Sequence, residues 1–294
     1  MTSRRTSAVW GAPATAVDPV VDVLVPTSSR LAELATVLAG LAGQDDPPFR
    51  VTVSDQSEDH LLAAEPSVTA MLRVLEVQGR APRVLRHLPR RGVAEHRAFL
   101  LAQATAEYVL FLDDDVWLEP GTIALLHDAI TDLDCGVVGA AQQGLSFLDD
   151  ERPREQEPFA RWEDGVQPER LRKDSPGTER WTLHNAANLV HIAARTELPD
   201  AGWLPYRVAW LAGCVLYRRS ALEAVGGFDF WRRLPPNHGG EDVAAQWKVM
   251  ERFGGAGVLP SGAVHLEAPT TVPDRSVDAA TAVFEEETAG RSAG

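Results

Sequence analysis

Cysteine is scarce in this chain of 294 residues, which contains only Cys135 and Cys214. Two cysteines so far apart exclude a disulfide scaffold and a cysteine-rich zinc site, because both need several cysteines at short spacing. Scarce cysteine is typical of proteins in a reducing compartment, so we expect a cytoplasmic location.

Long apolar runs and an excess of positive charge are also missing. No run approaches the ~20 apolar residues of a membrane span. The chain has 28 Lys and Arg against 42 Asp and Glu, a net charge of −14. Nucleic acids and anionic membranes are bound through excess Lys and Arg, so neither is expected as the main partner. Peripheral membrane contact stays open, although no basic amphipathic helix is evident.

The first twenty residues contain a pair of arginines, as some export signals do, but prolines and aspartates interrupt the segment. We therefore predict a flexible lead over 1–20. One folded domain is expected over 21–268, followed by a mobile, acidic and alanine-rich tail over 269–294. No internal repeat is present, and frequent alanine, arginine and valine are typical of a GC-rich bacterial genome.

Strand and helix patterns alternate in the first half of the domain. Apolar runs predict buried strands over 21–26 and 107–112, a second strand over 49–55 and a third, weaker one over 82–89. Helical periodicity between them predicts helices over 29–43 and 92–106. This alternation favours a parallel, Rossmann-like sheet, whose ligands bind outside the carboxyl ends of the strands. Thr27, Asp55 and the acidic run that follows residue 112 lie at that edge.

The second half continues the alternation less regularly. Helices are predicted over 121–133, 220–228 and 239–255, and strands over 135–143, 207–219 and 256–267. Residues 147–180 are charged, contain prolines and have few aliphatic side chains. We expect an extended loop or insertion there, either disordered or acting as a lid over a site.

Three aspartates follow the apolar run of the segment "EYVLFLDDDVWLEP", residues 107–120. Carboxylates at a strand end are good ligands for Mg²⁺ and Mn²⁺, and a cation would relieve the repulsion among Asp113, Asp114 and Asp115. A solvated acidic turn explains the same residues, so the run alone does not decide between the two readings.

Several segments in order carry a resemblance to a known family: "VLVPT", "VSDQSED", a "GxxxxR" pattern at Gly92 and Arg97, "FLDDDVWLEPGTI", "LAGCVLYRRSALEAVGGFD" and "GGEDV". Together they resemble the GT-A fold nucleotide-sugar glycosyltransferases of the inverting family two, over residues 21–267. Ala98 departs from the family, which usually has asparagine there. The resemblance implies a single α/β GT-A domain with a mixed, mostly parallel sheet flanked by helices. Its nucleotide-binding half would reach to about residue 116, and its acceptor half would follow.

The resemblance also implies an activity and its cofactor. The expected reaction is metal-dependent, inverting transfer of a sugar from a nucleoside diphosphate sugar to an acceptor hydroxyl on a bacterial glycan, glycolipid or secondary metabolite. A divalent cation, Mn²⁺ or Mg²⁺, would stabilise the charge that develops on the departing diphosphate. The sugar, the nucleotide base, the acceptor and the oligomeric state stay open, a homodimer included.

The resemblance assigns roles to individual residues. On the nucleotide side it places Pro26, Thr27, Asp55, Arg97, Asp113 and Asp114. The metal would be held by Asp115, with Asp113 and His265 as further ligands. Asp242 matches the general base that accepts the proton of the acceptor hydroxyl, with Glu241 beside it.

Each assignment has a plainer alternative. Glu241 and Asp242 are also favourable charges at a helix N-terminus, and His265 could be an ordinary hydrogen-bonded histidine. His238 is either a loop histidine or a group that orients an acceptor.

The tryptophans divide into two predicted groups. Trp181, Trp203 and Trp231 lie in loop-like segments and could form an apolar platform for a sugar ring. Trp210 and Trp247 are expected in the core.

Two alternatives concern the whole protein. One is a catalytically inactive nucleotide-binding interaction module. The other is an aspartate-dependent phosphatase, which normally carries its aspartates after the first strand, whereas at least two strands precede them here.

Overall fold

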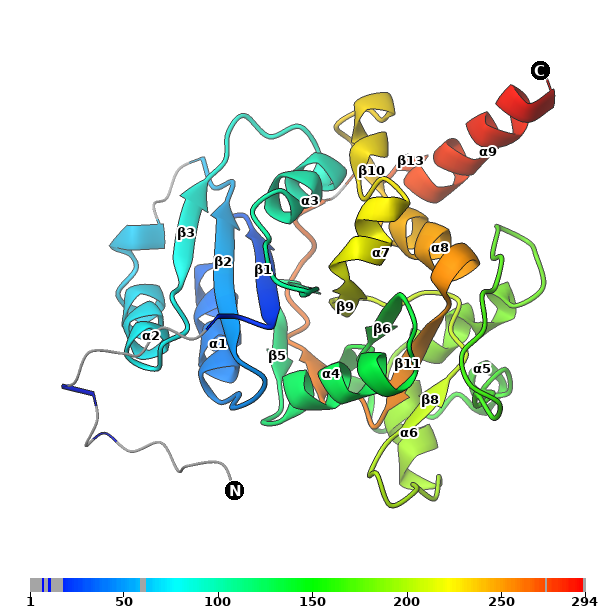
Figure 1. Cartoon of the computed structure of the whole chain (residues 1–294), viewed down its shortest axis with the longest axis horizontal. Coiled ribbons are helices and arrows are strands. Elements are labelled where there is room, and N and C mark those ends of the chain that lie inside the picture. The colour runs from blue at the N-terminus through cyan, green and yellow to red at the C-terminus, as the bar shows by residue number, and fades with distance from the viewer. Residues whose placement is uncertain (1–6, 8–9, 12–17, 59–61, 273, 293–294) are drawn as a thin grey trace.

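The central sheet confirms the predicted α/β class. The computed structural model describes residues 7, 10–11, 18–58, 62–272 and 274–292. Within them, an eight-stranded sheet has the order β3-β2-β1-β4-β9-β6-β11-β8 (Figure 1). These strands are β1 (Val21–Thr27), β2 (Phe49–Asp55), β3 (Arg83–Arg86), β4 (Tyr108–Leu112), β6 (Val137–Gly139), β8 (Leu204–Tyr206), β9 (Cys214–Arg218) and β11 (Gly255–Leu259). β9 runs antiparallel to β4 and β6, so the sheet is mixed, with parallel pairing among β3, β2, β1 and β4.

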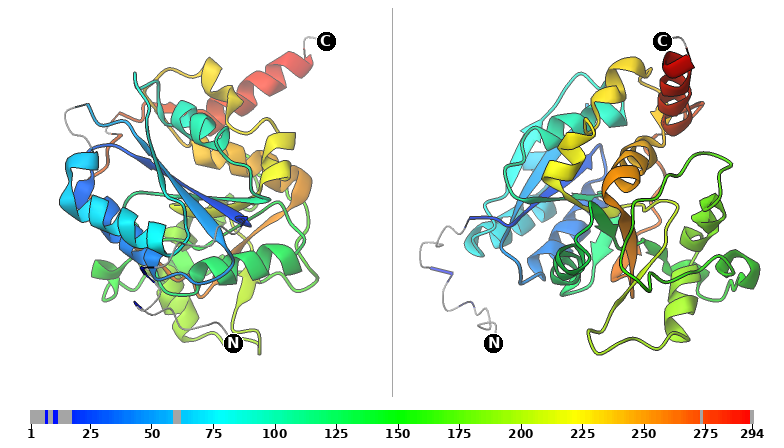
Figure 2. Two further views of the ribbon diagram at one scale, coloured as in Figure 1. Left: turned by 60° about the vertical axis from the view of Figure 1, so that its left-hand side comes forward. Right: turned by 45° about the vertical axis from the view of Figure 1, so that its right-hand side comes forward.

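Helices cover both faces of the sheet (Figure 2). One face packs against α1 (Leu31–Ala42), α2 (Pro66–Val77) and α4 (Thr122–Asp132). The other packs against α3 (Val93–Leu101), α7 (Arg219–Ala224) and α8 (Glu241–Phe253). Alternate residues of β4 enter opposite cores, which explains why this strand is a continuous apolar run rather than an alternating one.

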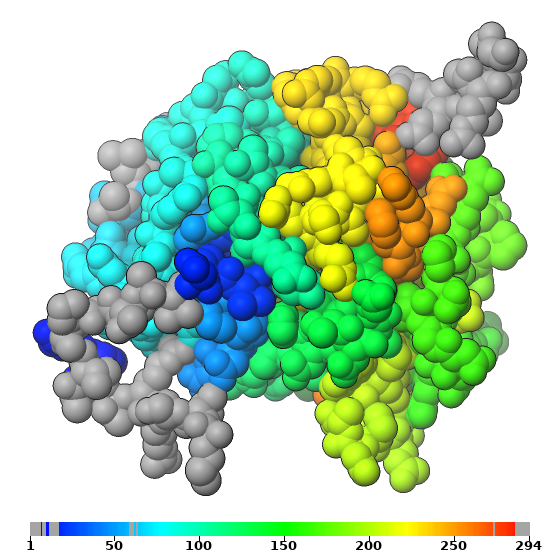
Figure 3. Space-filling model, viewed as in Figure 1, coloured from blue at the N-terminus to red at the C-terminus, as the bar shows by residue number. Residues whose placement is uncertain are grey.

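The parallel strands of the first half end at one edge of the sheet. Thr27 and Asp55 are paired in the register of β1 and β2, and Asp113 follows the neighbouring strand β4. The space-filling view shows this half, in blue and cyan, packed against the second half in green, yellow and orange (Figure 3). The edge therefore faces elements from the second half of the chain.

A smaller sheet extends this edge. It contains β5 (Val116–Leu118), β7 (Gln143–Gly144) and β12 (Ala263–His265). In its register His265 lies opposite Val116, the residue after Asp115. The single strand predicted over 256–267 is thus two strands in different sheets, and this division carries His265 to the acidic run.

The strand predicted over 207–219 is much shorter than expected. Only 214–218 form β9, because Gly213 has a positive φ of 72° and residues 207–213 run irregularly. The side chain of Gln246 bonds both backbone groups of Leu211, at 2.7 Å each. A side chain therefore replaces the strand partner that Leu211 lacks.

The predicted insertion, 147–180, is mainly loop and packs against the core that contains α8. It contains the short helix α5 (Pro153–Gln156) and begins the 3-10 helix η4 (Thr178–His184), while α6 (Asn188–Ala194) follows. Leu171 is fully buried, and Arg180 forms an ion pair with Glu169. The lid role remains a prediction.

The C-terminal segment differs from the mobile tail that we predicted. β13 (Val277–Asp278) pairs with β10 (His238–Gly239), and α9 (Ala279–Ser292) follows directly. Ala280, Val283 and Phe284 are buried in the core that contains α8. Their spacing, i, i+3 and i+4, is the helical signal that the acidic composition obscured.

Two further sequence predictions concern the N-terminal lead and membrane spans. Most of the predicted flexible lead, 1–20, lies outside the described residues. Among the helices of the described residues, none combines the length and apolar character needed to cross a membrane.

Candidate active site

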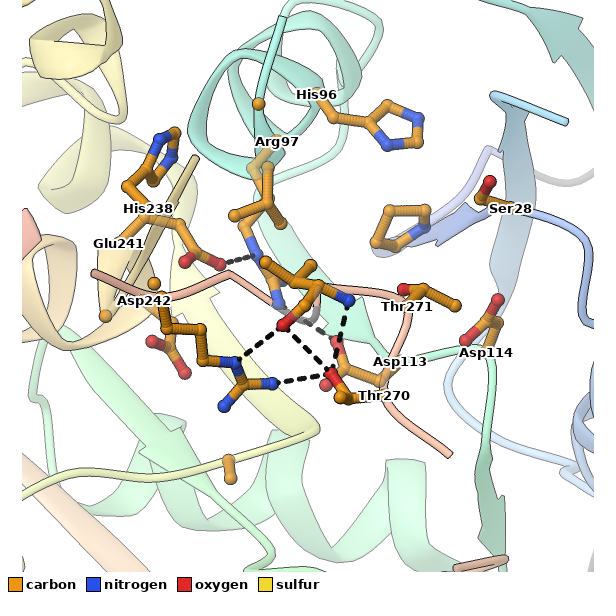
Figure 4. A pocket seen from close by; sticks show the side chains of 18 of the residues that line it. Ser28, His96, Arg97, Asp113, Asp114, His238, Glu241, Asp242, Thr270 and Thr271 are labelled. Carbon is orange, nitrogen blue, oxygen red and sulfur yellow. Dashed lines mark hydrogen bonds and ion pairs between the residues drawn. The ribbon is translucent and has the colours of Figure 1, made fainter. Parts of the chain in front are cut away.

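A cavity of about 990 Å³ lies at the carboxyl edge of the sheet. Most of the predicted site residues line it: Pro26, Thr27, Arg97, Asp113, Asp114, Asp115, Glu241, Asp242 and His265. The lining also includes residues that sequence reasoning did not select: Arg30, Arg90, His96, Gln142, Thr270, Thr271 and Arg275. Figure 4 shows Arg97, Asp113, Glu241 and Asp242 grouped around the cavity, with Thr270 and Thr271 nearby. The cavity therefore joins both halves of the chain.

Asp55 is the predicted residue that the structure keeps apart. It is buried, its Oδ1 accepts the backbone N–H of Ser57 at 2.8 Å, and Arg86 lies 3.8 Å from its Oδ2. Among the described residues, Gln56 lines the cavity where Asp55 does not. Asp55 therefore shapes the loop after β2, and its predicted contact with a nucleotide base remains a prediction.

A guanidinium lies between two of the three aspartates. Arg30 Nη1 donates to Asp114 Oδ1 at 2.9 Å and to Asp115 Oδ2 at 2.6 Å. Thr27 donates its hydroxyl proton to the other Asp114 oxygen at 2.6 Å. Burial raises the pKa of Asp114 to about 6, although Thr27 and Arg30 act in the opposite direction. A positively charged side chain of the protein therefore lies beside two of the aspartates.

The third aspartate belongs to a different ion-pair network. Arg97 donates from Nη2 to Asp113 Oδ1 and from Nε to Glu241 Oε1, both at 2.9 Å (Figure 4). Arg97 and Glu241 are buried, whereas the side chain of Asp113 is 32% exposed. One side chain of α3 therefore joins the end of β4 to the start of α8.

Asp242 occupies the first turn of α8 with few polar contacts. Gly240, with a φ of 76°, turns the chain into the helix, and Asp242 Oδ1 accepts the N–H of Val243 at 2.8 Å. Burial raises the pKa of Asp242 to about 7, and the charges of Glu241 and Asp113 add to this, whereas Arg97 lowers it. A carboxyl group with this pKa can exchange a proton near neutral pH.

His265 and Asp115 are a pair of metal-type ligands that line the cavity together. His265 Nε2 lies 3.3 Å from Asp115 Oδ2, and this contact raises the pKa of His265. In the part of the chain that the structure describes, no three His, Cys, Asp or Glu side chains converge as a metal site. The described residues thus offer two ligands for a metal ion rather than a complete coordination shell.

Two tryptophans form a stacked pair on the second-half side of the cavity. The rings of Trp181 and Trp210 are 4.7 Å apart at an interplanar angle of 22°, and both residues line the cavity. Trp210 lies in the irregular segment before Gly213 and packs against the core, as predicted, while it also lines the cavity. Trp203 and Trp231, two members of the predicted platform, pack instead at the edges of the two cores.

The sheet order and the position of the cavity define the fold as GT-A. A mannosyltransferase from Pyrobaculum calidifontis, solved with GDP-mannose and Mn²⁺, is 18% identical with a TM-score of 0.53, and the match covers 90% of this chain and 63% of that one. TarS residues 1–349 from S. aureus, solved with UDP-GlcNAc, are 17% identical with a TM-score of 0.52, over 86% of this chain and 60% of that one. The chain thus spans less than two thirds of each.

The family follows from the sequence match. The model of the family described as "Glycosyl transferase family 2" matches residues 22–226, more than half of the chain. This protein belongs to glycosyl transferase family 2. A search of curated proteins found no match to the chain.

Proposed function

We propose that this glycosyltransferase moves a sugar from a nucleoside diphosphate sugar to an acceptor hydroxyl, with inversion and with the help of a divalent cation. The observation that carries the proposal is the placement of two kinds of acidic group in one cavity. The strand-end aspartates can hold a cation and a diphosphate, and Asp242, with a pKa of about 7, can accept a proton. The nucleotide sugars bound to the two similar structures support this choice of donor.

Asp115 and His265 fit a divalent cation. Ligands at about 2.1 Å from an octahedral ion lie about 3 Å from one another when they are adjacent. The distance of 3.3 Å between Asp115 Oδ2 and His265 Nε2 is close to that separation. With two ligands from the protein, phosphate oxygens and water would complete the shell, as is usual for Mg²⁺. When bound, the cation would stabilise negative charge on the departing diphosphate.

Asp242 is the proposed general base. A hydroxyl is a weak nucleophile, and a carboxylate that accepts its proton assists direct displacement, which inverts the anomeric centre. Glu241 is less suited to this role because its Oε1 is already bound by Arg97. We assign Glu241 the task of fixing Arg97, and hence the start of α8, against the strand end.

Nucleotide binding tests the proposal directly. We expect UDP, GDP or dTDP to raise the melting temperature when Mn²⁺ is present and to have a smaller effect without it, because the cation joins the diphosphate to Asp115. Differential scanning fluorimetry of the full chain, with and without EDTA, measures this. Stabilisation by none of the three nucleotides would contradict the proposed donor class, and binding without transfer from any nucleotide sugar would favour an inactive binding module.

Arg30 supplies a second prediction, because it holds the same Asp115 oxygen that lies nearest to His265. We expect Arg30→Gln to tighten the binding of Mn²⁺ alone roughly tenfold, since Asp114 and Asp115 then lose the guanidinium charge that they share. Titration followed by electron paramagnetic resonance, without nucleotide, measures the change. Arg90→Gln removes the same charge from elsewhere in the cavity lining and is the matched control. Equal affinity in both variants would show that Arg30 does not compete with the cation.

A further inference from the structure

His238 is a buried histidine in β10, four residues before the proposed base Asp242. It contributes to the lining of the cavity, but both of its ring nitrogens are already bonded to the backbone. Nδ1 lies 2.6 Å from the carbonyl oxygen of Pro235, and Nε2 lies 3.1 Å from the backbone nitrogen of Ala94. Neither nitrogen is left for an acceptor molecule, so the ring does not orient an acceptor through a hydrogen bond.

The two partners of His238 determine which nitrogen carries the proton. A carbonyl oxygen can only accept a hydrogen bond, so Nδ1 carries a hydrogen and donates it to Pro235. A backbone N–H can only donate, so Nε2 accepts from Ala94 with its lone pair. Both bonds therefore require the neutral ring in a single tautomer.

The bond to Ala94 satisfies the first turn of α3. Ala94 is the second residue of this helix, where backbone N–H groups have no partner within the helix, and the N-cap residue, Gly92, has no side chain to supply one. The ring also packs closely on Gly92, where an added Cβ would lie 2.5 Å from His238 Cε1. A side chain 144 positions away along the chain therefore caps α3.

A second bond joins the same two elements. Arg97, three residues after Ala94 in α3, donates to Glu241 at 2.9 Å. The segment that enters α8 is thus held to α3 at two points, by His238 and by Glu241. Asp242 follows the second point directly, so its position depends on how this segment is held.

The C-terminal strand β13 holds the other side of the segment. His238 pairs with Val277, and Gly239 pairs with Asp278. An added Cβ on Gly240 would lie 3.0 Å from Asp278 Oδ2, so this turn packs closely on β13. The segment therefore lies between α3 and β13, and the ring of His238 provides one of its contacts with α3.

We infer that His238 is a positioning residue for sugar transfer, whose neutral ring fixes the turn that places Asp242 at the cavity. The inference rests on the proposed function for the role of Asp242 as the base. Without the bond to Ala94, one of the two points that hold the turn to α3 is lost, and a displacement of about 1 Å at a reacting group can lower a rate on the order of 10²-fold. The strand-end aspartates that we assign to the donor follow β4, so donor binding does not depend on this bond.

Two amide side chains of different length test the bond to Ala94. In His238→Gln the amide oxygen can replace Nε2 as the acceptor, whereas the shorter side chain of His238→Asn can replace only Nδ1 as the donor. We expect His238→Asn to lower kcat about 10- to 100-fold with little change in KM for the donor, and His238→Gln to retain most of kcat. Nucleoside diphosphate with Mn²⁺ should raise the melting temperature of both variants as it does that of the wild type. His191→Gln, at a histidine of α6 that bonds the carbonyl of Leu148, is the matched control and should transfer sugar as the wild type does.

A double-mutant cycle tests whether His238 acts through Asp242. When the base is absent its position no longer matters, so in the Asp242→Asn background His238→Asn should lower the remaining transfer by less than about twofold. Hydrogen exchange of the Ala94 amide, followed by NMR, reports on the bond without any need for activity. We expect this amide to exchange faster in His238→Asn than in the wild type and in His238→Gln.

Three results would overturn the positioning role alone. They are equal kcat in His238→Gln and His238→Asn, an equal fold loss from His238→Asn with and without Asp242→Asn, and an Ala94 amide that stays protected in His238→Asn. Wild-type transfer by Asp242→Asn would instead refute the proposed base, and the positioning role with it. An absent nucleotide response in the wild type would count against the proposed donor class and would leave the exchange of the Ala94 amide unchanged.

Discussion

Asp242→Asn is expected to lower sugar transfer by about 10²–10⁴-fold while nucleotide binding is retained. The amide keeps the size of the side chain and can still accept the N–H of Val243, but it cannot take a proton from the acceptor. In the wild type, the rate should fall about tenfold per pH unit below pH 7, because the carboxyl group, with its pKa of about 7, becomes protonated there. The variant should lose this decrease of the transfer rate below pH 7, which is the acid limb of the rate profile.

The same substitution is expected to stabilise the fold at alkaline pH. The pKa of Asp242 is raised from 3.8 in the unfolded chain to about 7 in the folded one, so the folded state binds more protons between these values. Stability conferred by the neutral form is therefore complete below about pH 4 and is lost as the pH rises toward 7. Asparagine does not ionise and escapes this loss. We expect a melting temperature several degrees above that of the wild type at pH 8 and a negligible difference near pH 4.

Transfer assays at saturating donor and melting curves at pH 4 to 8 measure both effects. Asp128→Asn, an exposed position on α4, is the matched control and should alter neither. Wild-type transfer by Asp242→Asn would remove Asp242 as the base. A variant that melts below the wild type at pH 8 would instead show that the carboxylate is stabilised where it lies.

Arg97→Ala is expected to destabilise the protein by about 3–5 kcal/mol, because it leaves the buried carboxylate of Glu241 without its cation. This corresponds to a fall in melting temperature on the order of 10 °C. Asp113 contributes less, since its side chain is partly exposed and water can screen it. Loss of the positive charge should also move the acid limb of the rate profile to higher pH, because Arg97 lowers the pKa of Asp242.

A double-mutant cycle separates the charge from the packing. Arg97→Ala with Glu241→Gln should recover part of the lost stability, as the unpaired buried charge is then absent. Arg97→Lys keeps the charge, but an ammonium group cannot bond Glu241 and Asp113 with the geometry of the guanidinium. We expect its melting temperature to lie between those of the wild type and Arg97→Ala. Urea denaturation of the four proteins of the cycle gives the coupling energy. A coupling energy near zero would mean that the ion pair does not stabilise the junction.

Periodic patterns predicted the parts of the fold whose side chains alternate or recur regularly. The strands up to residue 112, of which β3 is partly exposed, and the helices that became α4 and α8 are of this kind. The strand over 207–219 was overestimated because apolar residues continue through Gly213, and periodicity does not report the positive φ that ends the strand. Trp210, in the irregular segment before this break, packs against the core as we expected and also lines the cavity.

The site residues were predictable where they follow strands or begin helices. Asp113, Asp115 and Asp242 could be placed at the cavity because parallel strands share a carboxyl edge and the family motifs recur in order. Arg30 could not be found this way. Its contact with Asp114 and Asp115 depends on how the loop after β1 turns, and Ser29 adopts a positive φ of 61° there. A non-glycine residue in that conformation carries no sequence signal.

The position of β9 in the sheet has a consequence for the two halves of the domain. β4 is the last large strand of the nucleotide-binding half, yet it pairs with β9, which follows a hundred residues later in the chain. A fragment that ends near residue 116 would carry β4 as an open, apolar edge with both faces uncovered, the arrangement that promotes aggregation. The halves are therefore not separable modules. A newly made chain has no protected β4 until synthesis has passed residue 218, and the cavity, which both halves line, cannot be complete before then.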